Sequence, residues 1–181
     1  MTLTRVVRFR SETDPLIVRL RTQRGEPAYT RTEEHVAAGT ITLTDDLGRW
    51  AFRYTRLDLS GAPTGINVVF LNQSPGSVHV DWNRTVFVDP TRRSRRLIHR
   101  GVKLTDREAA TPASVVPAGA GLDDFVFPTD AIFFVSGRYG GWSASPVFER
   151  LRPGDSFTLV VGLQAGGQAT ERNFRFRVVP G

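Results

Sequence analysis

Hydrophobic and polar positions alternate along much of the chain, most clearly at its two ends. Residues 4–9 and 16–22 carry apolar side chains between arginines, and turn-forming residues separate the two runs. Residues 156–163 form another apolar run, and residues 170–179, beyond a Gly-Gly pair, again alternate apolar side chains with arginines. Because successive side chains of a strand point to opposite faces of its sheet, each pair of runs predicts a β-hairpin.

Another hairpin is predicted closer to the middle of the chain. Thr40–Thr44 alternates threonine with isoleucine and leucine, and the turn formers Asp45–Gly48 follow it. Trp50 and Phe52 then share one face of the next run, and Arg53 lies on the other face. The turn chemistry between the two runs favours a tight connection.

The stretch from Ile66 to Lys103 organises the remaining strands. Its first run, Ile66–Leu71, is apolar on both faces, as suits the centre of a sheet. Its second run, Val78–Trp82, alternates again and ends on a tryptophan. Together they predict a central strand pair that Phe70 and Trp82 anchor in the core.

The whole chain is predicted to be one all-β domain spanning residues 1–181. Turn signals separate about nine or ten strands, and no helix longer than a turn or two is expected. This pattern indicates an antiparallel β-sandwich, immunoglobulin-like or with Greek-key connections. A chain of 181 residues can bury such a core without disulfide or metal support.

Composition restricts the partners and the chemistry. The net charge is +6, the cations are almost all arginine, and Lys103 is the single lysine. A basic balance is compatible with nucleic acid, anionic lipid or acidic polymer as partner. The absence of cysteine excludes disulfides, Cys-ligated zinc and thiol catalysis. No signal peptide and no membrane span are predicted, because no apolar run is long enough.

Several segments resemble one known group of proteins. They read FLNQSPGSVHVDWNRTVFVD, RLIHRGVK, PASVVPAGAGLDDFVFPTD and PGDSFTLVVGLQAGGQATERNFRFRV, and they cover roughly residues 64–179. This pattern resembles bacterial β-sandwich envelope proteins, often lipoproteins, of unknown function. The resemblance implies a cell-envelope or extracellular location and carries no catalytic motif. The chain lacks the signal segment and the acylatable cysteine of the lipoprotein members, which leaves a cytoplasmic location open.

The densest cluster of charge follows the second central run and consists of Arg92, Arg93, Arg95, Arg96 and Arg100. Guanidinium groups this close in sequence would attract phosphate, so nucleic acid or another acidic polymer is a candidate partner. No established RNA- or DNA-binding motif accompanies them. A solvated turn, or pairing with the chain's own carboxylates, is the commoner explanation of such a cluster.

A glycine-rich segment at residues 137–142 is predicted to be a loop that displays Tyr139 and Trp142. Trp142 is a candidate contact with a partner, and a lid over one end of the sandwich is the alternative. The other aromatic residues fall on strand faces and are expected in the core, including Phe133 and Phe134.

No residue pattern points to catalysis. His35, His79 and His99 lie far apart in sequence without metal-binding spacing, and the loop around Asp123, Asp124 and Asp130 lacks the spacing of a calcium-binding EF-hand. Adjacent carboxylates on a strand point to opposite faces, so acidic pairs fit turns or solvated edges. Neither a nucleophile elbow nor a phosphate-binding loop is present. We assign no catalytic, cofactor-binding or metal-binding residue.

The sequence thus predicts a protein that is not an enzyme. We expect a binding or scaffolding module of the bacterial cell envelope or of a surface assembly, acting through loops and edge strands toward a protein partner or further copies of itself. The alternatives are a nucleic-acid-binding protein and, by fold analogy alone, a carbohydrate-active enzyme. The candidate contact residues are Arg92, Arg93, Arg95, Arg96, Arg100, Tyr139 and Trp142.

Overall fold

The computed structural model describes residues 4–11, 14–21, 35–37, 40–55, 65–138, 140–145 and 154–179. These residues form fourteen β-strands and two short 3-10 helices, with no α-helix among them. The strands are β1 (Thr4–Ser11), β2 (Asp14–Arg21), β3 (His35–Ala37), β4 (Thr40–Thr44), β5 (Gly48–Thr55), β6 (Gly65–Asn72), β7 (Val78–Val88), β8 (Ser94–His99), β9 (Ser114–Val116), β10 (Gly121–Pro128), β11 (Ile132–Val135), β12 (Gly141–Ala144), β13 (Ser156–Ala165) and β14 (Gln168–Val179). The 3-10 helices are η1 (Leu104–Asp106) and η2 (Thr129–Ala131).

Twelve of the strands form one antiparallel sheet. Its order is β1-β2-β14-β13-β7-β8-β10-β6-β5-β4-β3, and β9 pairs with β7 outside this path. β11 and β12 form a separate two-stranded sheet. The prediction of an all-β antiparallel protein is therefore confirmed. The expected nine or ten strands were too few, because four of the fourteen are only three or four residues long.

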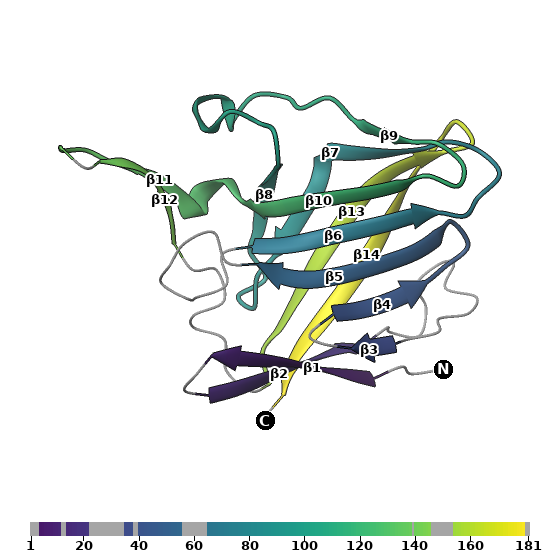
Figure 1. The fold of residues 1–181 in the computed structure, drawn as a ribbon, viewed down its shortest axis with the longest axis horizontal. Coiled ribbons are helices and arrows are strands. Elements are labelled where there is room, and N and C mark those ends of the chain that lie inside the picture. Colours follow the sequence, from purple (N-terminus) through teal and green to yellow (C-terminus); the bar gives the residue numbers. More distant parts are fainter. Residues whose placement is uncertain are drawn as a thin grey trace.

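β8 joins the two halves of the large sheet. Its first residues pair with β7, with Arg96 opposite Val86, and its last residues pair with β10, with His99 opposite Val126. Because one strand changes partners along its length, the sheet curls into an open half-barrel (Figure 1). Among the described strands, all except β11 and β12 belong to this one sheet. The predicted assignment to an immunoglobulin-like sandwich stays a prediction.

The hairpins predicted from local alternation are confirmed. β1 pairs with β2, β4 with β5, and β13 with β14, each antiparallel. The predicted central pair is wrong: β6 lies between β5 and β10, whereas β7 lies between β13 and β8. The end of β6 and the loop after it are held to the half of the sheet that contains β4, β5, β6 and β10. The Gln73 N–H donates to the Leu47 carbonyl at 2.9 Å, and the Asn72 N–H donates to the Ala120 carbonyl at 2.9 Å. The chain then crosses to the other half.

The hydrophobic core lies between the two facing halves. Phe52 of β5 packs on Phe174 of β14 with ring centroids 4.5 Å apart, and Trp50 stacks on Phe70 at 4.1 Å. Phe70 is fully buried and Trp82 is 3% exposed, so both predicted core anchors are confirmed. Burial of these large rings supplies the main driving force for closing the sheet.

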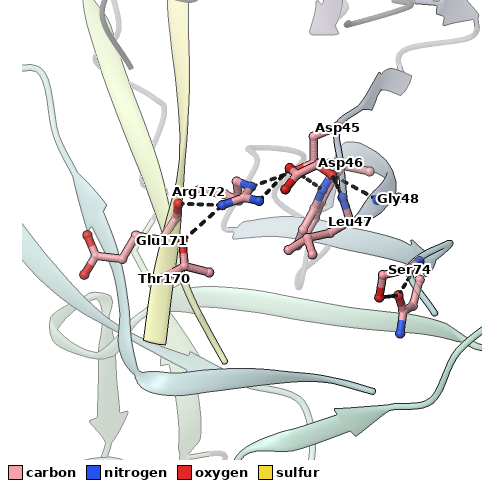
Figure 2. A network of polar contacts seen from close by, with 10 residues as sticks. Asp45, Asp46, Leu47, Gly48, Ser74, Thr170, Glu171 and Arg172 are labelled. Atoms are coloured by element: carbon pink, nitrogen blue, oxygen red, sulfur yellow. Dashed lines mark hydrogen bonds and ion pairs between the residues drawn. The ribbon is translucent and has the colours of Figure 1, made fainter. Parts of the chain in front are cut away.

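A buried ion-pair cluster fastens the two halves together. Arg172 of β14 is 4% exposed, and its Nε donates to Asp45 Oδ2 at 2.8 Å while its Nη2 donates to Asp46 Oδ1 at 2.7 Å (Figure 2). Burial acts to lower the pKa of Arg172, but hydrogen bonds and the charges of Asp45 and Asp46 outweigh it and raise this pKa. The guanidinium is therefore charged in the folded protein.

The turn before β5 is built to present these carboxylates. Asp45 Oδ1 accepts hydrogen bonds from the backbone N–H of Leu47 and of Gly48, both at 3.0 Å, and its Oδ2 accepts one from Trp50 Nε1 at 3.1 Å. Gly48 has φ of 153°, and a Cβ there would clash with the Leu71 carbonyl oxygen. The acidic pair at residues 45–46 is thus a structural feature of a turn, as predicted, with a buried arginine that the sequence did not point to.

Candidate functional site

The two-stranded sheet of β11 and β12, hereafter the arm, is the most distinctive surface feature. It extends away from the curled sheet as a separate hairpin (Figure 1). Its strands pair antiparallel, with Phe133 opposite Ser143 and Val135 opposite Gly141. Neither strand of the arm is hydrogen-bonded to any other strand that the structure describes. Both outer edges of the arm are therefore open within this part of the chain.

Large apolar side chains are exposed on the arm to an unusual degree. Phe133 is 46% exposed, Phe134 61%, Val135 46% and Trp142 39%. In the described part of the chain, the other exposed large hydrophobic residue is Val115, at 57%. Soluble proteins rarely group such side chains on the surface, and a contiguous exposed patch commonly marks an interaction site.

Both faces of the arm are apolar. Phe134 lies directly opposite Trp142, and their rings meet edge to face with centroids 5.5 Å apart. Phe133 and Val135 flank Phe134 in the strand, so alternation directs them to the opposite face. A flat surface could thus cover only half of the exposed apolar groups.

The root of the arm is firmly packed. Ile132 is 7% exposed and belongs to a small core cluster with Ile98, Phe125 and Phe127. The Ser145 N–H donates to the Ala131 carbonyl at 2.7 Å and closes the base of the hairpin. An isolated two-stranded hairpin is marginally stable in water, so this root is what holds the arm in shape.

Two arginines of the predicted cluster lie beside this root. Arg95 Nε and Nη2 contact Asp130 Oδ1 at 2.8 and 2.7 Å, and Arg93 Nη2 lies 3.9 Å from Asp130 Oδ2. Asp130 belongs to η2, which leads directly into β11. Arg107, which the sequence gave no reason to select, places its guanidinium carbon 5.4 Å from the Trp142 ring centroid. The structure thus brings together two patches that the sequence treated separately.

The five clustered arginines do not act as one array. Arg96 donates through Nη1 to the Glu108 carbonyl at 2.7 Å and through Nη2 to the Ala109 carbonyl, so its guanidinium holds the loop before β9. Arg92 and Arg100 lie at opposite ends of β8 and are exposed. Their guanidinium groups have no hydrogen-bond or ion-pair partner in the described residues. Some arginines of the cluster are therefore paired within the protein, whereas Arg92 and Arg100 face solvent.

The turn that displays Arg92 is organised by Asp89. Asp89 Oδ1 accepts hydrogen bonds from the Thr91 hydroxyl at 2.6 Å and from the backbone N–H of Arg93 at 3.0 Å. Burial acts to raise the pKa of Asp89, but these hydrogen bonds and the charge of Arg95 lower it below its ordinary value. Arg92 adopts a positive φ of 66° in this turn. This turn between β7 and β8 therefore carries an ionised carboxylate at its start.

A largely buried His–Asp pair links β8 to β10. His99 Nδ1 is 2.9 Å from Asp124 Oδ2, the imidazole stacks on Trp82 with centroids 4.4 Å apart, and Trp82 Nε1 donates to Ser114 Oγ at 2.8 Å. His99 Nε2 is buried without a hydrogen-bond partner. No third potential metal ligand joins this pair in the described residues. Asp123 and Asp130 pair elsewhere, with Asn67 and Arg95, so the three carboxylates weighed for calcium do not converge.

Two predictions about the arm were wrong. Trp142 lies on β12 and not in the predicted loop, and the Gly140 N–H before that strand donates to the Gly137 carbonyl at 2.9 Å. Phe133 and Phe134 are exposed although they were expected in the core. The glycines after the run 132–135 were the signal of a hairpin. Tyr139 lies outside the described residues.

No protein-family model matches the chain, and neither the curated proteins nor the solved structures include a significant match. Among the described residues, no helix is long and apolar enough to cross a membrane. The fold and the site together define an all-β antiparallel protein with a projecting aromatic arm.

Proposed function

We propose that this protein is a non-catalytic binding or scaffolding module of the bacterial cell envelope or of a surface assembly, and that the arm is its contact element. One observation carries the proposal: four of the five exposed large hydrophobic side chains of the described residues gather on one projecting hairpin. Aromatic side chains of this kind are the usual energetic centres of binding sites. The described residues offer no comparable grouping of catalytic side chains.

The architecture favours a contact role. The arm has a packed root and open edges, so it can present its side chains without disturbing the core. Edge strands that offer free backbone groups commonly pair with a partner. The proposed envelope location rests on the resemblance to bacterial envelope proteins. We also propose that the fold is an immunoglobulin-like sandwich, which the two facing halves of the sheet support.

Site-specific photo-crosslinking tests the contact role. A benzophenone amino acid replaces Phe134 in one variant and Val115 in the other, and cells producing the full chain are irradiated. Both positions are exposed and apolar, at 61% and 57%, so they differ mainly in location. We expect adducts at position 134 and few at position 115. Equal labelling of the two positions, or no adduct at either, would contradict the proposal.

The nucleic-acid alternative makes a different prediction. Affinity for DNA or RNA would fall steeply with salt and with replacement of Arg92 and Arg100, the two arginines whose guanidinium groups are unpaired in the described structure. Arg95 and Arg96 are occupied within the protein. The available charge is therefore smaller than the five arginines suggest, which favours the arm as the contact element.

A further inference from the structure

We propose that the arm inserts into the headgroup region of an anionic phospholipid surface, with the arginines around its root contacting the phosphates. This inference rests on the proposed function, because it names what the arm contacts. Two observations support the proposal: the exposed apolar side chains on both faces of the arm, and the arginines close to it. No other surface of the described residues combines them.

The two apolar faces are the first argument. Phe134 and Trp142 occupy one face, and Phe133 and Val135 the other. A flat protein surface would desolvate one face and leave the other in water. The interfacial region of a bilayer is fluid and encloses an inserted hairpin on all sides, so it can cover both faces at once.

The side-chain chemistry and the length of the arm fit an interface. Tryptophan and other aromatic residues are favoured at the boundary between headgroups and acyl chains, where a ring can be partly apolar and partly hydrated. A four-residue strand spans about 13 Å. That reach matches shallow insertion, and it is far short of the roughly 30 Å hydrocarbon core of a bilayer.

Charge at the root supplies the complementary attraction. Residues 89–108 hold seven basic and three acidic residues in a chain with a net charge of +6. The Arg93 side chain is 73% exposed beside Asp130 at the root, and Arg107 lies over the ring of Trp142, which is opposite Phe134 in the outer half of the arm. Basic residues near a membrane surface are drawn to anionic lipids within about a Debye length. The arginines are thus placed to meet phosphates as the aromatic side chains enter.

The open edges of the arm set the depth of insertion. Unpaired backbone N–H and C=O groups cannot be satisfied in hydrocarbon. In the described structure neither β11 nor β12 has a further strand beside it. Insertion therefore stops where water and headgroup oxygens can still bond to the edges, and the curled sheet stays outside the bilayer.

Sedimentation with lipid vesicles tests the inference. The full chain is mixed with vesicles of phosphatidylcholine alone, or of phosphatidylcholine and phosphatidylglycerol in equal parts. We expect binding to the anionic vesicles that weakens as salt increases. Phe134→Ser should lower the affinity by about tenfold, because it removes a large apolar group from the inserted face. Phe134 is exposed, so this variant should fold, as circular dichroism will verify.

A pair of arginine variants separates local from overall charge. Arg93→Ala should lower vesicle affinity by about fivefold, whereas Arg175→Ala, which removes the same charge from an exposed position on β14, should have a smaller effect. Equal losses from the two variants would mean that only net charge matters, and would overturn the placement of the arginines at the lipid surface.

The remaining outcomes distinguish this inference from the proposed function. No binding to anionic vesicles at low salt overturns the lipid inference, as does binding that Phe134→Ser leaves unchanged. If position 134 then crosslinks specifically to a protein, the arm remains the contact element and the occupant is a protein cleft. If position 134 crosslinks to nothing, the proposed function fails as well.

Discussion

Arg95 contacts Asp130 through two nitrogens, at 2.8 and 2.7 Å from Oδ1, and so ties the arginine-rich strand β8 to the root of the arm. The contact links residues 35 positions apart. It places Arg95 at the root from which the exposed aromatic side chains project, and the proposed lipid contact depends on this arrangement.

Asp130→Asn tests the charge at the root without altering the arm itself. The Asp130 side chain is 42% exposed, so we expect a loss of only ~0.2–1 kcal/mol in the free energy of unfolding. Affinity for phosphatidylglycerol vesicles should rise, because Arg93 and Arg95 lose their competing carboxylate. Glu171→Gln on β14, which breaks the exposed pair with Arg84 of β7, is the matched control and should leave vesicle binding nearly unchanged. Weaker binding by Asp130→Asn would argue against phosphate contacts at the root.

The buried cluster of Arg172 should dominate the electrostatic contribution to stability. Arg172→Ala leaves the Asp45 carboxylate, whose side chain is 1% exposed, without its cation. Breaking a buried pair on one side typically costs ~3–5 kcal/mol. Arg84→Ala removes an exposed ion pair to Glu171 and should cost at most ~1 kcal/mol. Urea unfolding of both variants measures the difference, and similar losses would show that the cluster does not hold the halves together.

The contribution of Asp89 to stability should be lost at low pH. The folded-state pKa of Asp89 lies below its ordinary value of 3.8, so its contribution to stability is fully present above that value. The contribution is lost as pH falls below it and through the lowered pKa, because the carboxylate then binds a proton in the folded state as well. Unfolding free energies of the wild-type protein and of Asp89→Ala should therefore differ at neutral pH and converge in acid. A difference that grows as the pH falls would contradict this linkage.

Local pattern predicted the parts of the fold that form between neighbours in sequence. The hairpin β13–β14 closes through Gly166 and Gly167, both with positive φ, and the turn at Asp45–Gly48 satisfies its own backbone. Such structure depends on a few adjacent residues and can be inferred from them.

Long-range pairing could not be predicted in this way. β6 and β7 are consecutive in the chain and look like a hairpin, yet β8 and β10 separate them in the sheet. The end of β6 is instead held by backbone contacts of Asn72 and Gln73 with Ala120 and Leu47, which are far away in sequence. The arginine that pairs with Asp45 is likewise 127 positions distant. No local pattern identifies these partners.

The arm shows why hydrophobicity alone does not predict burial. The run Ile132–Val135 has the composition of a core strand, but only Ile132 reaches a packed cluster. The other three residues project past the edge of the sheet, where no second layer of the described structure covers them. Trp142 was selected from the sequence, whereas Arg107 could be found only from its position over that ring.

The most direct measurement compares two valine-to-serine variants in the vesicle assay. Val135, on the arm, is 46% exposed, and Val115, on β9, is 57% exposed, so the same chemical change is made at two similarly accessible sites. We expect Val135→Ser to weaken binding to vesicles containing phosphatidylglycerol severalfold, and Val115→Ser to bind as the wild-type protein does. Equal binding by the two variants, or a greater loss from Val115→Ser, would contradict the assignment of the arm as the membrane contact.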